Sequence, residues 1–439
     1  MPKRRCGSFD EAMKRWSSAK LLRTSEFVYA ILALFALTQG PVYQVWKSSA
    51  ERLESLPSPS LPFIYFVSFL VVQLPALLLL ARRTTREWLS LRSYQALIVL
   101  VVWFGLSVVW STFARDSLPE FAALVITIAF GVYLGSSFSV REVWWIIALA
   151  MAAGVVTSWF AVMRLWDGAY NFIDGYWIGI YFNRNSLAPV AAVAIIAAVA
   201  VIVVELGVSS KKPSRVLLVA GASSALIVFS AIEIWKSESQ TSPFALAVAA
   251  GAVVVWGILR WSGGKISRLR FLVSLAAPIT LVILGITLFV ALREIGRLGG
   301  VSTEVATLNS RRAFWSLSWS AFLEKPLFGW GWMAAWRNPE FFGSGFWNPA
   351  WDVAWSHNGY LDILLGGGVL AGLLFGLFVW CGAYQMGRGD VRTTSLGMLL
   401  LGFIFSAATQ ESFFVGSHFL WALMIATLVR SSVDKQHAG

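Results

Sequence analysis

A histidine lies at the entrance of an apolar stretch in the last third of the chain. The segment Ser356–Leu361 (SHNGYL) directly precedes a glycine-rich stretch that includes Gly366, Gly367, Gly368 and Gly372. A histidine side chain titrates near neutral pH, so His357 could accept a proton from a hydroxyl nucleophile at the rim of a membrane cavity. The alternative is a histidine that only anchors a helix end at an interface. Both interpretations fit this residue taken alone.

Three arginines fall in segments for which the charge distribution below predicts an extracytoplasmic position. They are Arg311 and Arg312, and Arg184 within Tyr181–Ser186 (YFNRNS). Arginine pairs bidentately with phosphate oxygens and keeps its charge in a poorly hydrated cleft. Each could instead be a solvated charge or one that touches lipid phosphates. Cations are scarce on the outer side of most membrane proteins, which favours an anionic ligand there.

Two further ionisable residues lie close to apolar stretches. Lys236 belongs to the short segment Trp235–Ser242 (WKSESQTS), where it could face a shared cavity or be solvated in a turn. Glu411 is flanked by apolar stretches on both sides. It is therefore either the buried partner of a cation or a turn residue in contact with water.

The composition shows which solvent surrounds these residues. Hydrophobic residues make up 57% of the 439 residues and charged residues 13%, about half the charged share of a soluble domain. The surface must therefore face lipid to a large extent. The net charge of +12 forms no continuous basic stripe, because apolar runs separate the lysines and arginines. A nucleic-acid partner is not expected.

Apolar stretches long enough to cross a bilayer occur about twelve times, which predicts an all-α polytopic membrane protein. Their approximate ranges are 27–45, 61–81, 94–114, 118–137, 143–163, 185–206, 216–234, 242–260, 271–292, 359–384, 395–410 and 413–430. Most of the 35 lysines and arginines fall on one side when these stretches alternate from a cytoplasmic N-terminus. Both termini are therefore predicted to be cytoplasmic.

The resulting organisation has one long extracytoplasmic loop. The predicted parts are a basic tail (1–26), nine spans (27–292), the loop (293–357), three spans (358–430) and a short cytoplasmic tail (431–439). Within the loop, apolar residues recur at helical spacing from Asn309 to Phe322, which predicts an interfacial amphipathic helix that Pro326 ends. A glycine- and tryptophan-rich stretch follows and is expected at the headgroup level.

Several common catalytic motifs are absent from the sequence. It contains no Walker-type phosphate loop, no Cys/His metal cluster and no Gly-x-Ser-x-Gly elbow. It also lacks a close pair of carboxylates in an outer loop that could hold a divalent cation. We therefore expect chemistry without a metal or other cofactor.

The segment from Asn309 to Gly372 resembles the O-antigen ligase and polymerase family. The resemblance rests on Asn309–Arg311 (NSR), Trp315, Glu324–Gly331 (EKPLFGWG) and His357–Leu361 (HNGYL), followed by the glycine-rich stretch. Weaker similarity occurs in Gly179–Leu187, which contains NRNSL, and in Gln410–Ser412 (QES). The predicted topology, with its long loop between spans 9 and 10, also matches.

The resemblance implies a GT-C-like glycosyltransferase of the bacterial inner membrane with its active site facing outward. Its donor would be a glycan on undecaprenyl pyrophosphate, and its acceptor a hydroxyl or amide of a glycan, lipid or protein. It implies that His357 activates the acceptor and that Arg311 or Arg312 grips the pyrophosphate, aided by Arg184 or Lys236. Asn358, Glu411, Asn185 and Gln240 would have supporting roles. Displacement without a metal would invert the anomeric configuration.

One position departs from the family pattern. Many members carry Ser-Arg or Ser-Lys where this chain has Ser239-Gln240. Either Lys236 or Arg184 could supply the missing charge. Two other hypotheses remain open, namely a transporter or lipid-carrier flippase that only binds a pyrophosphate headgroup, and a catalytically inactive scaffold of envelope assembly.

Overall fold

The computed structural model describes ten segments of the chain. They are residues 7–44, 72–81, 92–164, 168–170, 175–208, 213–261, 304–337, 356–414, 416 and 418–433. Every named element within these segments is a helix, and an isolated β-bridge pairs Tyr170 with Trp177. The predicted all-α class is therefore confirmed for the described part of the chain.

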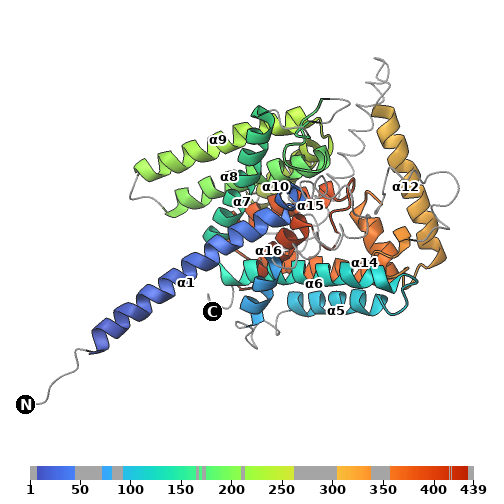
Figure 1. The fold of residues 1–439 in the computed structure, drawn as a ribbon, viewed down its shortest axis with the longest axis horizontal. Coiled ribbons are helices and arrows are strands. Elements are labelled where there is room, and N and C mark those ends of the chain that lie inside the picture. Colours follow the sequence, from blue (N-terminus) through green and yellow to red (C-terminus); the bar gives the residue numbers. More distant parts are fainter. Residues whose placement is uncertain are drawn as a thin grey trace, which may run out of the picture.

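The helices pack into a bundle. Helix α1 projects from one side of it, and α12 lies at the opposite side (Figure 1). Their bounds are α1 Gly7–Leu37, α5 Arg92–Ser107, α6 Ala114–Ser137, α7 Val140–Met163, α8 Arg184–Val208, α9 Pro213–Ser237, α10 Thr241–Trp261, α12 Glu304–Glu324, the 3-10 helix η2 Ala335–Arg337, α14 Gly359–Met386, α15 Val391–Ala407 and α16 Phe419–Val433.

Five of the described helices are long and apolar enough to cross a membrane. They are α6, α7, α14, most of α8 (Arg184–Leu206) and most of α9 (Ser214–Ser237). Shorter apolar helices cover Val72–Ala81, Ser93–Ser107, Thr241–Gly257, Val391–Ala407 and Phe419–Arg430. The predicted stretch 271–292 lies outside the described residues, and each of the other predicted stretches contains at least part of a helix. The total of about twelve spans stays a prediction.

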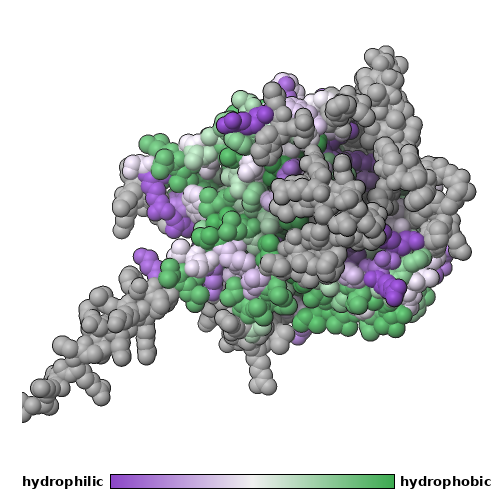
Figure 2. Space-filling model, viewed as in Figure 1, coloured by the Kyte–Doolittle hydropathy of each residue, from purple (hydrophilic) through white to green (hydrophobic). Residues whose placement is uncertain are grey.

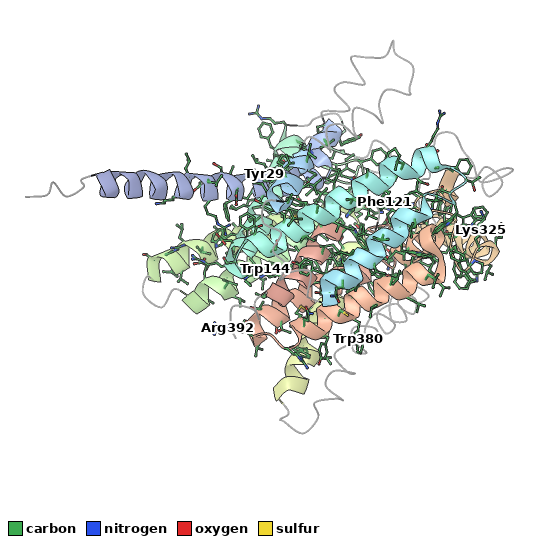
Figure 3. All side chains as sticks on the ribbon, turned by 90° about the horizontal axis from the view of Figure 1, so that it is seen from below. Tyr29, Phe121, Trp144, Lys325, Trp380 and Arg392 are labelled. Atoms are coloured by element: carbon green, nitrogen blue, oxygen red, sulfur yellow. The ribbon has the colours of Figure 1, made fainter. Side chains whose placement is uncertain are left out.

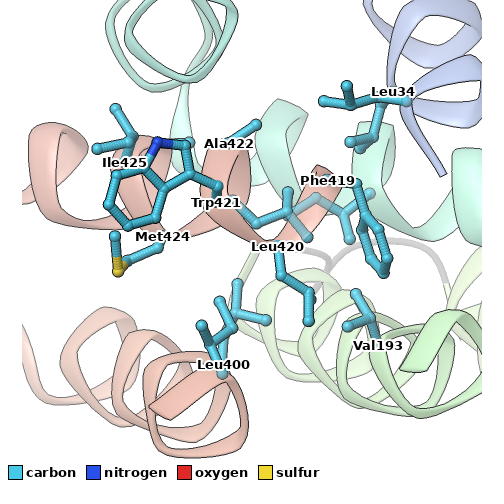
Figure 4. Packing of buried hydrophobic residues seen from close by; sticks show 14 of the residues in the cluster. Leu34, Val193, Leu400, Phe419, Leu420, Trp421, Ala422, Met424 and Ile425 are labelled. Atoms are coloured by element: carbon cyan, nitrogen blue, oxygen red, sulfur yellow. The ribbon is translucent and has the colours of Figure 1, made fainter. Parts of the chain in front are cut away.

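Helix α16 lies at the centre of the bundle. Its residues Leu420 to Ile425 are all fully buried, so the helix is apolar on every side, as expected for a helix surrounded by others. Figure 4 shows these side chains between Leu34 of α1, Val193 of α8 and Leu400 of α15. The core therefore ties the N-terminal helix to helices from the middle and the end of the chain.

Helix α6 approaches α16 very closely at two glycines. A Cβ atom at Gly131 would lie 2.6 Å from the carbonyl oxygen of Ala422, and one at Gly135 would lie 2.5 Å from that of Ala426. Small residues at such contacts let two backbones pack directly against each other, a common arrangement between helices in membranes. This packing fixes α16, and so helps to place the connection that precedes it.

An apolar face runs along the lower edge of the molecule in Figure 2. Among the large apolar side chains exposed on α5 and the turn that follows it are Val99, Val102, Leu106 and Val109, the last 82% exposed. Exposed apolar area of this extent is rare on a protein surrounded by water. It fits a surface in contact with lipid.

The helix predicted from Asn309 to Phe322 is observed as α12, but it begins five residues earlier, at Glu304. An acidic residue at the first position is favoured by the helix dipole, whereas Asn309 and Ser310 lie inside the helix. The helix ends at Glu324, two residues before Pro326, as predicted. Residues 293–303 and 338–355 of the predicted loop lie outside the described residues.

Candidate active site

Glu411 is the centre of a buried polar cluster. Its carboxylate forms an ion pair with the guanidinium of Arg311 through Oε1 and lies 3.0 Å from Nδ1 of His357 through Oε2. The side-chain amide of Asn185 also donates to Oε1, at 2.7 Å. These four residues, which we call the Glu411 cluster, come from α8, α12, the entrance of α14 and the connection between α15 and α16.

The connection between α15 and α16 holds Glu411 in place. Residues 410–414 of this connection are buried, and Glu411 itself is only 6% exposed. The backbone N–H of Gly359 donates to the carbonyl oxygens of both Ala408 and Glu411, at 2.9 and 3.1 Å. Because Gly359 is the first residue of α14, these bonds join Glu411 to the helix entrance that carries His357. Of the two alternatives from the sequence, the buried partner of a cation is the one observed.

His357 has an unusual backbone conformation at that entrance. Its φ angle is +53°, a left-handed value that non-glycine residues seldom adopt. Asn358 caps α14, since its side-chain oxygen accepts from the backbone N–H groups of Tyr360 and Leu361 at 3.1 and 3.2 Å. The indole of Trp315 on α12 donates to the carbonyl oxygen of His357 at 3.4 Å. Strain of this kind often accompanies functional sites.

The segment before the histidine is fixed by a buried carboxylate. Asp362, 4% exposed, accepts a hydrogen bond from the backbone N–H of Ser356 at 3.0 Å. The hydroxyl of Ser356 donates to the carbonyl oxygen of Asn358 at 2.6 Å. The sequence analysis did not single out Asp362, although an acidic residue in the first turn of an apolar span indicates a functional or structural role.

The start of α10 and the two residues before it lie beside the cluster, where two hydroxyl groups flank Gln240. Ser239 donates to the side-chain oxygen of Asn185 at 3.2 Å, and Thr241 donates to that of Gln410 at 3.2 Å. The side chain of Gln240 itself is exposed. Position 240 therefore lies beside the cluster at its exposed rim. Ser239 and Thr241 had no distinguishing feature in the sequence.

The other predicted cations make contacts of their own. The guanidinium of Arg184 lies 4.8 Å from the ring centroid of Tyr176, and the ammonium of the exposed Lys236 lies 4.8 Å from that of Trp235. None of the contacts among described side chains joins Arg184 or Lys236 to Glu411. Arg312 lies in α12, with its side chain outside the described part of the structure.

The chemistry of the cluster follows from the donor and acceptor roles of its groups. An ionised carboxylate can only accept hydrogen bonds, so the contact with Glu411 places the proton of a neutral His357 on Nδ1. The lone pair of Nε2 is then able to accept another proton. Arg311 has five N–H donors, of which its bond to Glu411 uses one. The arrangement can thus combine a base with a cation that binds anions.

The fold and this cluster define a multi-pass helical membrane protein with an ionic site where several helices end. Residues 225–376 match a family model described as O-antigen ligase, which confirms the resemblance to the O-antigen ligase and polymerase family seen in the motifs. Comparison with curated proteins gave no match. The matched residues include Arg311 and His357, whereas Asn185 and Glu411 lie outside them and join the site through the fold.

The match also indicates the general activity, that of an O-antigen ligase-type membrane glycosyltransferase. Proteins with this activity act on lipid-linked glycans and an acceptor.

Proposed function

We propose that this protein transfers a glycan from a polyprenyl pyrophosphate donor, such as undecaprenyl pyrophosphate, to an acceptor hydroxyl or amide. The observation that carries the proposal is the contact of one buried carboxylate, Glu411, with both His357 and Arg311. A base and an anion-binding cation are the two groups that such a transfer requires. Their convergence from distant parts of the chain gives the family match a physical basis.

His357 acts as the general base in this proposal. Its Nε2 atom takes the proton of the acceptor hydroxyl while the acceptor oxygen bonds to the anomeric carbon of the donor sugar. The bond between that carbon and the pyrophosphate oxygen breaks, and polyprenyl pyrophosphate leaves with the electron pair. A single displacement of this kind inverts the anomeric configuration. It proceeds without a metal, because a cation of the protein balances the developing charge.

Glu411 assists the base, and Arg311 binds the leaving group. The carboxylate of Glu411 fixes the imidazole through Nδ1 and stabilises the imidazolium that forms when Nε2 is protonated. The guanidinium of Arg311 uses its remaining N–H groups to bind the pyrophosphate, where planar donors match phosphate oxygens well. Arg312 on the next position of α12 is a second candidate for the same anion.

The length of α8 supports an outward-facing site. Asn185, in the first turn, contacts Glu411, and Glu205 near the other end pairs with Arg141 at 2.6 Å. The 20 residues between them span ~30 Å of helix, about the thickness of a bilayer's hydrocarbon core. The cluster and the Arg141 ion pair therefore lie near opposite membrane surfaces. Because the predicted cytoplasmic segments include Arg141, we place the cluster at the outer face of a bacterial inner membrane.

The acceptor distinguishes a ligase from a polymerase, and both remain within the proposal. A lipid-carrier flippase would need the cation but no oriented base, so the imidazole held by Glu411 favours a transferase. An inactive scaffold would need neither group.

The test is a His357→Ala variant in membranes that lack the native chain and contain the lipid-linked glycan donor. We expect product formation to fall by about 100-fold or more, in line with the usual contribution of a general base. His437→Ala, in the predicted cytoplasmic tail, serves as the control with an equal change of side chain. Undiminished product from His357→Ala at an equal protein level would rule out the proposed base.

A further inference from the structure

Helix α14 is broken ten residues from its start. Gly368 has φ +69° and ψ −169°, so the residues before and after it form two helical pieces with different axes. A break inside an apolar span exposes backbone N–H and C=O groups that lipid cannot satisfy. Such groups must find partners within the protein.

The segment Lys325–Gly331, which we call the strut, supplies those partners. The backbone N–H of Trp330 donates to the carbonyl oxygen of Leu365 before the break, at 2.8 Å. The backbone N–H of Val369 after the break donates to the carbonyl oxygen of Pro326, also at 2.8 Å. The strut thus takes the place of the helical hydrogen bonds on both sides of Gly368.

The contact is so close that it requires glycine on both sides. A Cβ atom at Gly368 would lie 2.1 Å from the carbonyl oxygen of Leu327, and one at Gly329 would lie 2.6 Å from that of Leu365. Both glycines also have positive φ angles, +69° and +68°. Any side chain at position 368 would therefore push the strut away from α14.

The strut also holds the end of α12. The indole N–H of Trp330 donates to the carbonyl oxygen of Ala321 at 2.8 Å, while its backbone N–H bonds to α14. The ammonium of Lys325 lies 3.8 Å from the centroid of the same indole ring. Figure 3 shows Lys325 at the end of the molecule where α12 meets α14. Trp330 therefore bridges the two helices that carry Arg311 and His357.

Both helices run from the candidate active site to the strut. Arg311 and Ala321 are separated by ~15 Å along α12, and Leu365 lies ~9 Å along α14 from Gly359, two residues after His357. One end of this pair of helices is joined by the Glu411 cluster and by the bond from Trp315 to His357. At the other end the strut joins them by hydrogen bonds, and Ala321 and Phe322 of α12 share a hydrophobic cluster with Leu365 of α14 and Trp330 of the strut.

We infer that the break at Gly368 and the strut form a joint that positions Arg311 opposite His357 for the reaction. Gly368 and Trp330 are then positioning residues, which act on the active site without touching substrate. This inference rests on the proposed function for its effect on activity, but its geometry can be tested separately. A displacement of about 1 Å at reacting groups is enough to cost roughly 100-fold in rate.

The first test compares Gly368→Ala with Gly376→Ala in the same helix. An added Cβ at Gly376 meets no atom within 4 Å, so this variant controls for the change of a helical glycine to alanine. We expect kcat to fall about 100-fold in Gly368→Ala and to stay within about twofold in Gly376→Ala. If Gly368→Ala does not fold, Trp330→Phe replaces it; this variant keeps an aromatic ring but loses the indole N–H that bonds to Ala321 and part of the ring area. Trp319→Phe on the exposed face of α12 is then the control.

A distance measurement separates positioning from a general loss of structure. Spin labels on Ser320→Cys of α12 and Leu377→Cys of α14, with the native cysteines replaced by serine, report how the two helices lie. We expect a shifted or broadened distance distribution in Gly368→Ala and Trp330→Phe, and an unchanged one in both controls. The joint would be ruled out if Gly368→Ala and Trp330→Phe lost activity with an unchanged distance distribution. It would also be ruled out if both of these variants kept normal activity. The two proposals can fail separately. If Gly368→Ala and Trp330→Phe shift the distance distribution and lose activity but His357→Ala remains active, the joint is supported and the proposed base is rejected.

Discussion

The imidazole Nδ1 of His357 lies 3.0 Å from the carboxylate Oε2 of Glu411, although the two residues are 54 positions apart. The contact exists because the connection between α15 and α16 folds back onto the first residue of α14. It gives the histidine a defined orientation and a counter-charge. Several predictions about activity depend on this pair and on its neighbour Arg311.

Replacement of Glu411 by glutamine should lower kcat while the protein stays folded. The amide keeps the size of the side chain, but it cannot stabilise the imidazolium and can donate to Nδ1, which favours the wrong tautomer. We expect a loss on the order of 100-fold in transfer rate, measured with purified donor in detergent or liposomes. Asp116→Asn, an exposed carboxylate at the start of α6, is the matched control and should retain its rate.

Replacement of Glu411 by alanine should have a different result. The side chain of Arg311 is only 12% exposed, and without Glu411 its charge would be buried with fewer partners. Breaking a buried ion pair on one side costs roughly 3–5 kcal/mol. We therefore expect a clear fall in thermal stability for Glu411→Ala and a smaller fall for Glu411→Gln, by fluorescence-detected unfolding. Equal stability of the two variants would contradict this account of the pair.

Substitution of Arg311 by lysine tests the anion site. Lysine keeps the charge, but it offers a single ammonium in place of a planar fork, so it cannot engage Glu411 and a pyrophosphate together in the same geometry. We expect the KM for the lipid-linked donor to rise about tenfold, with a smaller change in the KM for the acceptor. Arg115→Lys, at an exposed position, provides the comparison. An equal effect on both substrates would argue against pyrophosphate binding at Arg311.

Asp390, the N-cap residue of α15, should make the stability of the fold depend on pH. Burial acts to raise the pKa of Asp390, but hydrogen bonds from Thr393 and Arg392 and the charge of Arg392 outweigh it, so the pKa falls below its usual 3.8. A carboxyl with a lowered pKa in the folded state stabilises the fold above its unfolded pKa, and this contribution is lost as the pH falls through the folded value.

The corresponding experiment compares Asp390→Ala and Asp390→Asn with the native chain. At pH 6 the alanine variant should be less stable by about 1 kcal/mol, because the cap is lost. Its deficit should shrink as the pH is lowered below about 4. Asparagine caps helices equally well and does not titrate, so it should show no such trend. A deficit that is constant from pH 6 to pH 3 would exclude the charged cap as its cause.

The sequence was sufficient to predict the helical class and to name all four members of the cluster as candidates, His357 and Arg311 with direct roles and Glu411 and Asn185 with supporting ones. Lipid forces backbone groups to pair within helices, so apolar stretches could be recognised from composition alone. His357 and Arg311 were predicted because their side chains suit proton transfer and phosphate binding. Their contact through Glu411 could not be predicted, since it depends on how a buried connection packs against a distant helix.

The sequence also could not show which of two adjacent residues, Arg184 or Asn185, would contact Glu411. Arg184 was predicted to bind pyrophosphate and Asn185 to support the site; in the structure the guanidinium of Arg184 lies over Tyr176, whereas the adjacent Asn185 contacts Glu411. Successive residues of a helix point about 100° apart, so one position decides which side chain faces the site. The run Gly366–Gly368 was visible in the sequence, but the sequence did not show that the last of these glycines breaks α14.

Gln240, the departure from the family pattern, leads to the last prediction. Its neighbours Ser239 and Thr241 contact Asn185 and Gln410, so an arginine at position 240 would extend from the rim of the Glu411 cluster. The side chain is exposed, and an added charge there is worth at most about 1 kcal/mol. We expect Gln240→Arg to lower the KM for the lipid-linked donor by up to about fivefold, with the effect reduced at high salt. Gln240→Met, which has a similar length and no charge, should leave the KM unchanged. An unaltered KM in Gln240→Arg would show that the native cluster binds the donor without a cation at this position.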